Sequence, residues 1–170
     1  SPFVGERKKY LWEFGKFREG SKMMDFKDSE IRRILVPYDG SEQAQQAVRQ
    51  AAHIARLQGA TLMLLSVVDL NAEVAAFERV NMAGYDPAQL KEGAYEELAK
   101  ILREVPADIR TNSMVELGSP AEVIVETADD EGYDLVVMGS RGLGVVKGVL
   151  LGSVSQYIVE QAKCPVLVVK

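Results

Sequence analysis

Apolar residues follow two alternating patterns from about residue 31 to the end of the sequence. Short, nearly unbroken apolar runs, such as residues 61–68 and 134–138, have the length of β-strands. Between these runs, apolar residues recur every three or four positions, as in residues 41–58, which is the spacing of an amphipathic helix. Because the strand-length runs are apolar throughout, they indicate strands covered on both faces, as in a parallel sheet.

The expected strands and helices alternate along the chain. We expect strands at residues 31–37, 61–68, 108–116, 134–138 and 166–169. We expect helices at residues 41–58, 88–104, 119–132 and from 153 onward. With right-handed crossovers, this alternation predicts an α/β fold of the Rossmann-like type, a five-stranded parallel sheet with helices on both faces. We expect the strand order 3-2-1-4-5 for this sheet.

Capping residues mark several of the expected helix boundaries. Ser41 and Ser119 suit the N-cap position, and Pro120 suits the first position of a helix. Gly59 is expected to end the first helix. Ser153 is a further N-cap candidate, at the start of the last helix.

The predicted topology also indicates where a ligand would bind. In open parallel sheets, ligands bind at the carboxyl ends of the strands, where the strand order reverses. For the order 3-2-1-4-5 this crevice lies between the first and fourth strands. The first strand ends near Pro37, Asp39 and Gly40, and the fourth ends at residues 139–142. Two segments far apart in the sequence are therefore expected to converge on one cleft.

Residues 1–30 differ from residues 31–170, which we expect to form one folded domain. Between residues 1 and 22, aromatic and basic side chains are interleaved. Such a segment suits an amphipathic arm that docks on a partner or on a membrane surface. We favour a leader added for expression, or a dispensable extension, because Met23 or Met24 would serve as a natural start just before the folded part.

Charge and composition exclude some classes of protein. The 170 residues are 47% hydrophobic and 26% charged, as in an ordinary globular protein, with a net charge of −5. This charge argues against a general nucleic-acid binder, whose phosphate contacts need a basic face. No apolar run approaches the roughly 20 residues that span a bilayer, and no signal peptide is evident. We therefore expect a protein without a membrane span, in the cytoplasm.

Cys164 and His53 are single occurrences of their residue types. One cysteine excludes an internal disulfide and a cysteine-based metal site. Cys164 falls at a helix-to-strand junction, where a small buried hydrophobe is expected. His53 lies within a predicted helix, far in sequence from any activated nucleophile, and is expected to be structural or exposed.

A glycine-rich segment follows the fourth predicted strand. It reads Gly139-Ser140-Arg141-Gly142, then nine residues, then Gly152-Ser153. A strand, a glycine loop and a helix start gather backbone N–H groups at the positive end of a helix dipole, which favours phosphate oxygens. The spacing G-x-x-G-x9-G-S differs from the usual ATPase and dinucleotide patterns. The alternative is that these glycines only turn the chain.

With this motif, the sequence resembles the ATP-binding branch of the universal stress protein family. The likeness covers residues 31–170 and is carried by residues 34–41, 134–142, 151–155 and 164–169. It implies a bound adenine nucleotide, ATP or a related one, with adenine and ribose near Pro37, Asp39 and the backbone of Val67. The other implied nucleotide contacts, to the nucleoside, ribose and phosphates, are Met138, Gly139, Arg141, Gly142, Gly152, Ser153, Val154 and Ser155.

The resemblance also implies a role in the stress response and a homodimer formed through the last strand, residues 166–169. Arg141 would then fork onto phosphate oxygens. Asp39 is a candidate for bonding ribose hydroxyls or for holding Mg²⁺ or Mn²⁺. The alternative role of Asp39 is to cap the loop before the first helix.

A nucleotide-dependent regulatory switch is the function that the sequence favours. Hydrolysis needs a group that positions water and charge that stabilises the transferring phosphoryl group, and no Gln, Glu or His is clearly tied to the glycine motif. The alternatives are a slow ATP hydrolase or phosphotransferase, and a nucleotide-free dimeric stress scaffold. Another αβα nucleotide binder is the most remote alternative.

Overall fold

The computed structural model describes residues 30–69, 71–72, 87–143 and 151–170. The chain divides into residues 1–30 and the compact unit Ile31–Lys170. The extension or leader expected at residues 1–30 lies outside the described residues, apart from Glu30. All features below belong to the second unit.

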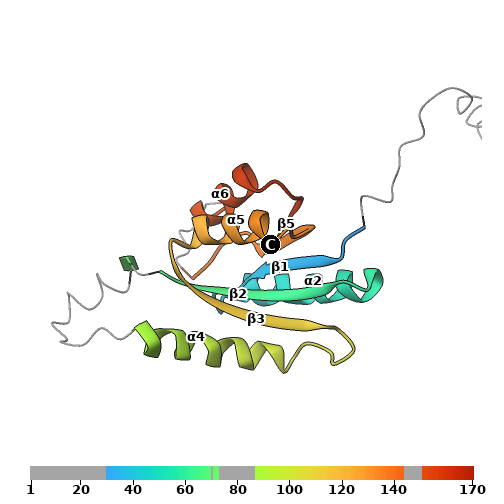
Figure 1. Ribbon diagram of the computed structural model, residues 1–170, viewed down its shortest axis with the longest axis horizontal. Coiled ribbons are helices and arrows are strands. Elements are labelled where there is room, and N and C mark those ends of the chain that lie inside the picture. The colour runs from blue at the N-terminus through green and yellow to red at the C-terminus, as the bar shows by residue number, and fades with distance from the viewer. Residues whose placement is uncertain (1–29, 70, 73–86, 144–150) are drawn as a thin grey trace, which may run out of the picture. The chain divides into compact units, whose positions relative to one another are not determined.

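Five parallel strands form one sheet in the order β3-β2-β1-β4-β5 (Figure 1). The strands are β1 Arg33–Pro37, β2 Thr61–Asp69, β3 Thr111–Gly118, β4 Leu135–Gly139 and β5 Val166–Val169. The helices between them are α2 Glu42–Gln58, α4 Pro87–Leu102, α5 Pro120–Asp130 and α6 Ser153–Gln161. The fold class and strand order expected from the sequence are confirmed.

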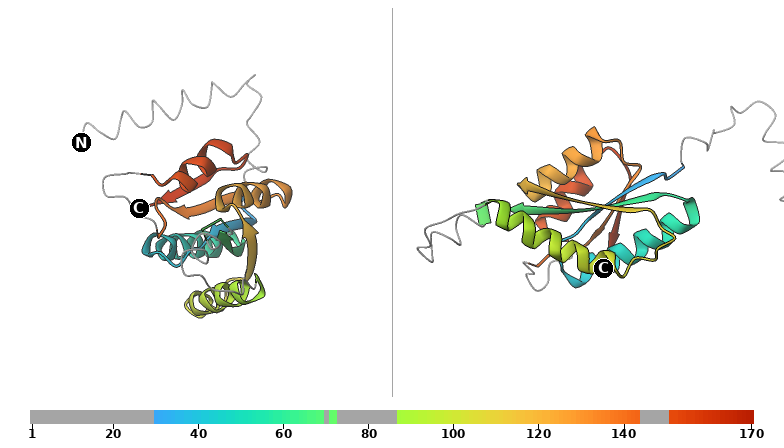
Figure 2. Two further views of the ribbon diagram at one scale, coloured as in Figure 1. Left: turned by 90° about the vertical axis from the view of Figure 1, so that its left-hand side faces the viewer. Right: turned by 60° about the horizontal axis from the view of Figure 1, so that its bottom comes forward.

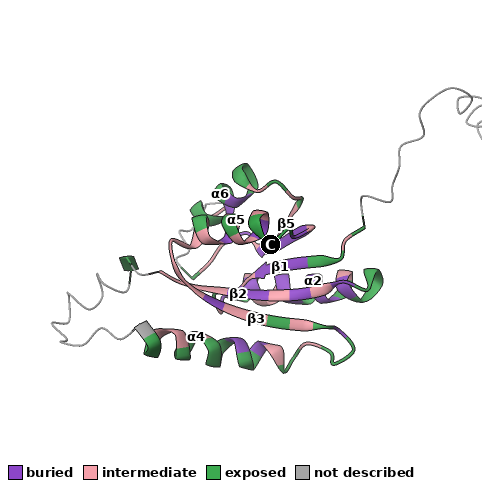
Figure 3. Ribbon diagram, viewed as in Figure 1, coloured by how far each residue is buried: buried purple, intermediate pink, exposed green. Residues whose placement is uncertain are grey.

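Two hydrophobic cores lie on opposite faces of the sheet. The alanine-rich side of α2 packs on one face with Leu98 and Ile101 of α4, whereas Ile124 of α5 and Ile158 of α6 pack on the other. Figure 2 shows these two helical layers with the twisted sheet between them. β1 and β4 are buried along most of their length (Figure 3), since alternate residues of each strand enter opposite cores.

The ends of α2 follow the expected capping chemistry. The Ser41 hydroxyl oxygen accepts a hydrogen bond from the Ala44 N–H at 3.2 Å. At the other end, Gly59 adopts a left-handed φ of 70° and its N–H donates to the Ala55 carbonyl. Ser119 is the N-cap of α5, as expected, although its side chain makes no capping hydrogen bond.

Two element boundaries differ from the expected ones. The third strand begins at Thr111, not at residue 108, because the Ile109 N–H bonds back to the Pro106 carbonyl at 3.0 Å in a turn. The last helix has Gly152 at its N-cap, and Ser153 is its first helical residue. Ser153 was expected at the cap on propensity alone, which does not fix the position to within one residue.

A carboxylate at the amino ends of β1 and β4 holds these strands in register. One oxygen of Asp134 accepts hydrogen bonds from the Arg32 and Arg33 N–H groups, both at 2.8 Å. The pairing that follows places Ile34 opposite Leu135. Because the two strands are parallel, this register also brings their carboxyl ends together at the opposite edge of the sheet, where the site described next is found.

Candidate functional site

β2 extends beyond the carboxyl end of its neighbour β1. Their pairing ends with Pro37 opposite Leu65, and the Tyr38 N–H donates to the Leu65 carbonyl at 2.8 Å. Backbone groups of alternate residues face alternate neighbouring strands. Val67, two residues after Leu65, therefore directs its N–H and C=O toward the side where β1 has ended. β2 presents there a donor–acceptor pair that none of the described strands covers.

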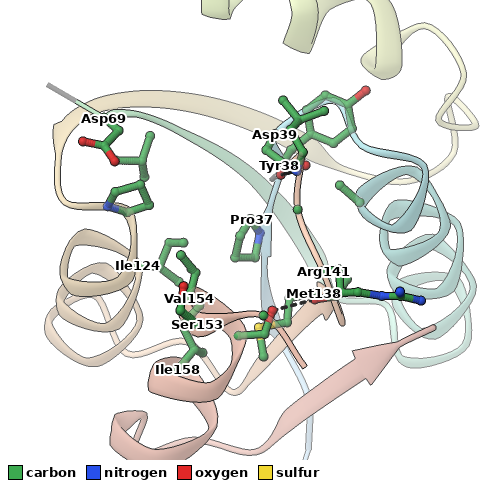
Figure 4. Close-up of a pocket in the computed structure, with 18 of the residues that line it drawn as sticks. Pro37, Tyr38, Asp39, Asp69, Ile124, Met138, Arg141, Ser153, Val154 and Ile158 are labelled. Carbon is green, nitrogen blue, oxygen red and sulfur yellow. Dashed lines mark hydrogen bonds between the residues drawn. The ribbon is translucent and has the colours of Figure 1, made fainter. Parts of the chain in front are cut away.

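A cavity of about 560 Å³ opens at this edge of the sheet (Figure 4). Its lining comes mainly from the ends of β1, β2 and β4, from the segments that follow these strands, and from the first two turns of α5 and α6. It includes every residue that the sequence analysis selected: Pro37, Asp39, Val67, Met138, Gly139, Arg141, Gly142, Gly152, Ser153, Val154 and Ser155. Their convergence on one cavity is a structural finding, whereas their role in binding a ligand stays a prediction.

One part of the cavity is apolar. Pro37 and Val67 contribute from the sheet, with Met138 at the end of β4, and Ile124 and Ile158 contribute from α5 and α6. In Figure 4, Pro37 lies near the centre and Ile124 and Ile158 lie on one side of it. A flat hydrophobic ring system would bury most of its surface among these side chains.

The three glycines of the motif differ in how closely the protein surrounds them. A Cβ on Gly139 would lie 2.7 Å from the Gln43 Cβ and 2.9 Å from the Gln43 carbonyl carbon, so α2 packs directly on this residue. A Cβ on Gly142 would press on a carboxylate oxygen of Asp39. A Cβ on Gly152 would meet nothing closer than 3.7 Å, which is ordinary contact. Only the third position is open as far as the protein's own described atoms are concerned.

Asp39 connects the end of β1 to the glycine-rich loop, defined here as residues 139–143. Its Oδ1 accepts a hydrogen bond from the Ser41 N–H at 3.0 Å, which is the capping role considered above. Its Oδ2 accepts a second one from the Leu143 N–H at 3.1 Å. The carboxylate therefore spans the cavity's edge between two segments 104 residues apart.

The N-terminus of α6 faces the cavity without a side-chain cap from the described residues. The first hydrogen bond of the helix runs from the Gln156 N–H to the Gly152 carbonyl at 2.8 Å. The N–H groups of Ser153, Val154 and Ser155 precede it and have no acceptor within the helix. The Ser155 hydroxyl is already used, because it donates to the Gly139 carbonyl at 3.0 Å and so attaches α6 to the end of β4.

Arg141 lines the cavity, but its guanidinium group does not point into it. In Figure 4 the side chain extends away from Pro37 and Val154. Its Nε is buried and has no hydrogen-bond partner among the described residues, and the same holds for the hydroxyl of the buried Ser140. A buried donor without a partner is costly. The orientation expected for phosphate binding therefore requires a different rotamer of Arg141.

Asp69 is the second carboxylate of the cavity lining. It ends β2, and its Oδ1 accepts hydrogen bonds from the Asn71 and Ala72 N–H groups at 3.0 and 3.2 Å. Like Asp39, it is held by backbone donors of the turn that follows its strand. Among the described lining residues, these two carboxylates and Arg141 are the charged groups.

Three other ionisable side chains, those of Tyr38, His53 and Cys164, are not placed or ionised to act as reactive groups in the cavity. Burial raises the pKa of the Tyr38 phenol, and nearby Glu97 adds to this, so the hydroxyl stays protonated at neutral pH. His53 is exposed on α2, as expected for a surface histidine. Cys164 is only partly buried, but burial still raises the pKa of its thiol, which suits a packing role better than a nucleophilic one.

Neither a cluster of metal ligands nor a membrane span occurs in the described part of the chain. No group of three or more His, Cys, Asp or Glu side chains is arranged there to hold a metal ion. Nor does any helix in that part combine the length and the apolar character needed to cross a membrane. Asp39 therefore has no neighbouring set of described ligands with which to form a metal site of its own.

Sequence comparison assigns the family. The family model described as the Universal stress protein family matches residues 30–170. The chain belongs to this family. A universal stress protein of Thermus aquaticus is 37% identical over 151 residues, covering 82% of this chain and 99% of the relative. The universal stress protein MJ0577 of Methanocaldococcus jannaschii is 31% identical over 157 residues, covering 82% of this chain and 94% of the relative.

Solved structures of the family share the fold. The structure of MJ0577 superposes with a TM-score of 0.70 at 33% identity, covering 83% of this chain and 96% of the other. A universal stress protein in complex with cAMP superposes with a TM-score of 0.62 at 27% identity, covering 82% and 97%. The resemblance read from the glycine motif is confirmed at the level of the family and its fold.

Sequence reasoning missed part of the lining of this universal stress protein's cavity. The missed residues are Tyr38, Ala44, Leu65, Asp69, Ala72, Pro120, Ile124, Leu143 and Ile158. The sequence could have placed the start of α5 at the cavity, because Pro120 begins a helix directly after a strand and so lies at the carboxyl edge of a parallel sheet. No signal identified Ile158, because its position depends on how α6 packs on the sheet.

Proposed function

We propose that this universal stress protein binds an adenine nucleotide, ATP or a close relative, in the cavity at the carboxyl edge of its sheet. The observation that carries the proposal is the arrangement of three features around one cavity. These are an apolar slot, the uncovered backbone pair of Val67, and the uncapped N-terminus of α6. A nucleotide has a matching apolar ring, polar base edge and anionic phosphate group.

The base would be recognised by the backbone of Val67. Adenine carries an acceptor at N1 beside a donor amine at N6, so it complements one N–H and one C=O. Guanine offers a donor at N1 and an acceptor at O6, which is the reverse pattern. A rigid strand cannot exchange its donor for its acceptor, so the site is expected to select adenine through main-chain atoms alone.

The phosphates would bind at the start of α6. The N–H groups of Ser153, Val154 and Ser155 have no acceptor within the helix, and the helix dipole favours an anion there. Gly152 leaves room for phosphate oxygens to approach. A phosphate would also attract the guanidinium group of Arg141 into the cavity and give its Nε, now without a described partner, an acceptor.

The sugar would lie between these two ends, beside Asp39. Each oxygen of this carboxylate accepts one backbone N–H, which leaves lone pairs for ribose hydroxyl donors. With no described cluster of protein ligands, Mg²⁺ or Mn²⁺ would enter, where it is needed, mainly through the phosphates of the nucleotide. The related universal stress protein crystallised with cAMP supports an adenine nucleotide as the class of ligand.

We propose a nucleotide-dependent regulatory switch as the function of this binding, with turnover as the alternative. Hydrolysis needs a residue that orients water. The described lining has only Asp39 and Asp69 as bases, and backbone donors already engage both. We therefore expect phosphate release well below the roughly 1 s⁻¹ at the low end of typical enzymes. A cytoplasmic location remains a prediction.

Selective binding of adenine tests the proposed function. The purified protein would be denatured and any released small molecule identified by mass spectrometry, followed by calorimetric titration with ATP and GTP. We expect a bound adenine nucleotide or ATP binding, with ATP preferred over GTP by about 100-fold or more, because guanine leaves both Val67 groups unpaired. Equal affinity for ATP and GTP would contradict recognition by Val67. Absence of binding by any adenine nucleotide would favour the nucleotide-free scaffold.

We also propose a homodimer formed through β5. This strand lies at the edge of the sheet and pairs only with β4 among the described strands. Its residue Leu167 is 38% exposed, and an apolar edge strand left uncovered favours aggregation.

Light scattering coupled to size-exclusion chromatography tests the dimer. We expect Leu167→Lys to shift the protein toward monomer, because it places a charge in the proposed contact. The matched control is Tyr95→Lys, since Tyr95 is a similarly exposed apolar residue on α4. A Leu167→Lys protein that remains dimeric at the wild-type concentration would disprove this interface, as would a soluble dimer lacking residues 165–170.

A further inference from the structure

The glycine-rich loop, residues 139–143, is attached to the rest of the domain at two places. At its start, the Ser140 N–H donates to the Val169 carbonyl at 2.7 Å, and the Ser140 carbonyl accepts the Gly152 N–H at 2.8 Å. These bonds join β4 to β5 and α6. At its far point, the Leu143 N–H donates to the Asp39 carboxylate at 3.1 Å. Among the described residues, Asp39 provides the side-chain contact that fixes this second place.

Gly142 shows how closely the loop is held there. A Cβ at this position would press against the same Asp39 oxygen that accepts the Leu143 N–H. The backbone conformation does not itself demand glycine, because Gly142 is not among the glycines with positive φ. The absence of a side chain at residue 142 is therefore matched to the approach of Asp39 and not to a strained turn.

We propose that Asp39 is a positioning residue that holds the glycine-rich loop in its binding geometry before any ligand arrives. We call the pair of hydrogen bonds from the Ser41 and Leu143 N–H groups to its two carboxylate oxygens the Asp39 latch. It is built from protein atoms only. Its consequence for nucleotide affinity rests on the function proposed above, since a loop ordered in advance costs less to order on binding.

A local role of Asp39 must be separated from the latch. Its bond to the Ser41 N–H, two residues on, is an ordinary turn that also starts α2. Serine at position 39 can form the same turn with its hydroxyl, but one hydroxyl oxygen on a shorter side chain cannot also reach Leu143. Asparagine keeps one acceptor oxygen and turns an NH₂ donor toward the second N–H group. Asp39→Ser and Asp39→Asn therefore break the latch in two chemically different ways.

The test is amide hydrogen exchange of the ligand-free full chain, read at Leu143 by NMR. We expect Asp39→Ser and Asp39→Asn to speed exchange at Leu143 about tenfold or more, which is the loss of one charge-assisted hydrogen bond. Gly142→Ala, which displaces the same carboxylate from the loop side, should do the same. The matched control is Ser41→Ala, which removes the α2 cap to the Ala44 N–H at 3.2 Å and leaves Asp39 in place.

The control separates loop positioning from general destabilisation. Ser41→Ala is expected to lower the melting temperature while exchange at Leu143 stays within about twofold of wild type, since its effect is confined to the α2 cap. The proposal is overturned if Leu143 exchanges at the wild-type rate in both Asp39 variants. It is equally overturned if Ser41→Ala speeds amide exchange at Leu143 as much as the two Asp39 variants do. The contact between Asp39 and Leu143 would then depend only on how α2 begins.

Titration with ATP then separates this proposal from the proposed function. If wild type binds ATP, the Asp39 variants should bind it about tenfold or more weakly, through the lost ordering of the loop together with the lost ribose contact proposed above. Gly142→Ala keeps the Asp39 carboxylate and should also weaken ATP binding, through the displaced latch. If wild type binds no nucleotide but the Asp39 variants still speed amide exchange at Leu143, the Asp39 latch is supported and the proposed nucleotide ligand is disproved. If ATP binds wild type and both variants equally, the loop needs no such positioning and the inference is overturned.

Discussion

Gly152→Val is expected to weaken ATP binding at least about 100-fold while the protein keeps its fold. An added Cβ would meet only Arg141 Cα and the Ser140 carbonyl oxygen, both at 3.7 Å, and the φ of −70° and ψ of 160° at Gly152 suit a β-branched residue. The branched side chain would instead occupy the space in front of the α6 N-terminus, where the proposed phosphate binds. An anion excluded from that position loses several charge-assisted hydrogen bonds at once.

Calorimetric titration with ATP and thermal unfolding together check this result. The matched control is Gly93→Val on α4, where an added Cβ would meet nothing within 4 Å and which does not line the cavity. Valine at an N-cap and valine in a helix each cost no more than about 1 kcal/mol relative to glycine, so both variants should remain folded. Unchanged ATP affinity in Gly152→Val would remove the phosphate site from this position.

Gly139→Ala, unlike Gly152→Val, is expected to cause a large loss of folding stability. The new Cβ would lie 2.7 Å from the Gln43 Cβ, 2.9 Å from the Gln43 carbonyl carbon and 3.1 Å from the Ala44 nitrogen. Because two of these are backbone atoms of α2, the strain cannot be relieved by rotating a side chain. Overpacking of this kind costs about 3 kcal/mol, which lowers the melting temperature of a chain of this size by roughly 6–12 °C.

Denaturant unfolding of Gly139→Ala, compared with Gly93→Ala, measures this cost. Gly93 is in the middle of α4 with open space around it, so alanine there should raise stability by up to about 1 kcal/mol through helix propensity. Equal stability of Gly139→Ala and wild type would show that α2 does not pack directly on the end of β4.

The different results expected for Gly152→Val and Gly139→Ala show that the glycines of one sequence motif have different structural roles. In G-x-x-G-x9-G-S, the three glycines were expected to surround the ribose and phosphates of a nucleotide. The structure gives Gly139 a packing reason and Gly142 a steric one, in its contact with Asp39; Gly152 alone is left open toward the cavity. Loss of binding in a Gly142 variant would therefore report on the position of Asp39 as well as on any phosphate, and Gly152 is the cleaner probe.

Most of the fold could be predicted because hydrophobic periodicity and capping residues are local. Residues 61–68 and 166–169 were expected as strands, and the structure has Thr61–Asp69 and Val166–Val169. The expected strand order 3-2-1-4-5 agrees with the observed sheet, although right-handed crossovers alone also allow other orders of five parallel strands. The boundary errors occurred where a neighbouring hydrogen bond decided the outcome, as at Ile109, whose N–H is held by Pro106 in a turn.

The candidate site was predictable as a location, and the residues selected from the motif and the family resemblance do line one cavity. The chemistry of individual side chains was less predictable. Arg141 was expected to point at phosphates, yet its guanidinium group points away from the cavity. Ser155 was expected at the ligand, and the structure shows that its hydroxyl bonds the Gly139 carbonyl, 16 residues away in the sequence.

The sequence by itself determined which segments become strands and helices, and that they alternate as in a parallel sheet with helices on both faces. These properties come from periodicity, capping and crossover handedness, which act over one or a few neighbouring elements. Only the tertiary structure decided that Ile124 and Ile158 close the cavity and that Asp39 spans it to Leu143. It also decided which glycine is open. Such contacts depend on how helices pack on the sheet to within an ångström, and no periodic pattern along the chain encodes that distance.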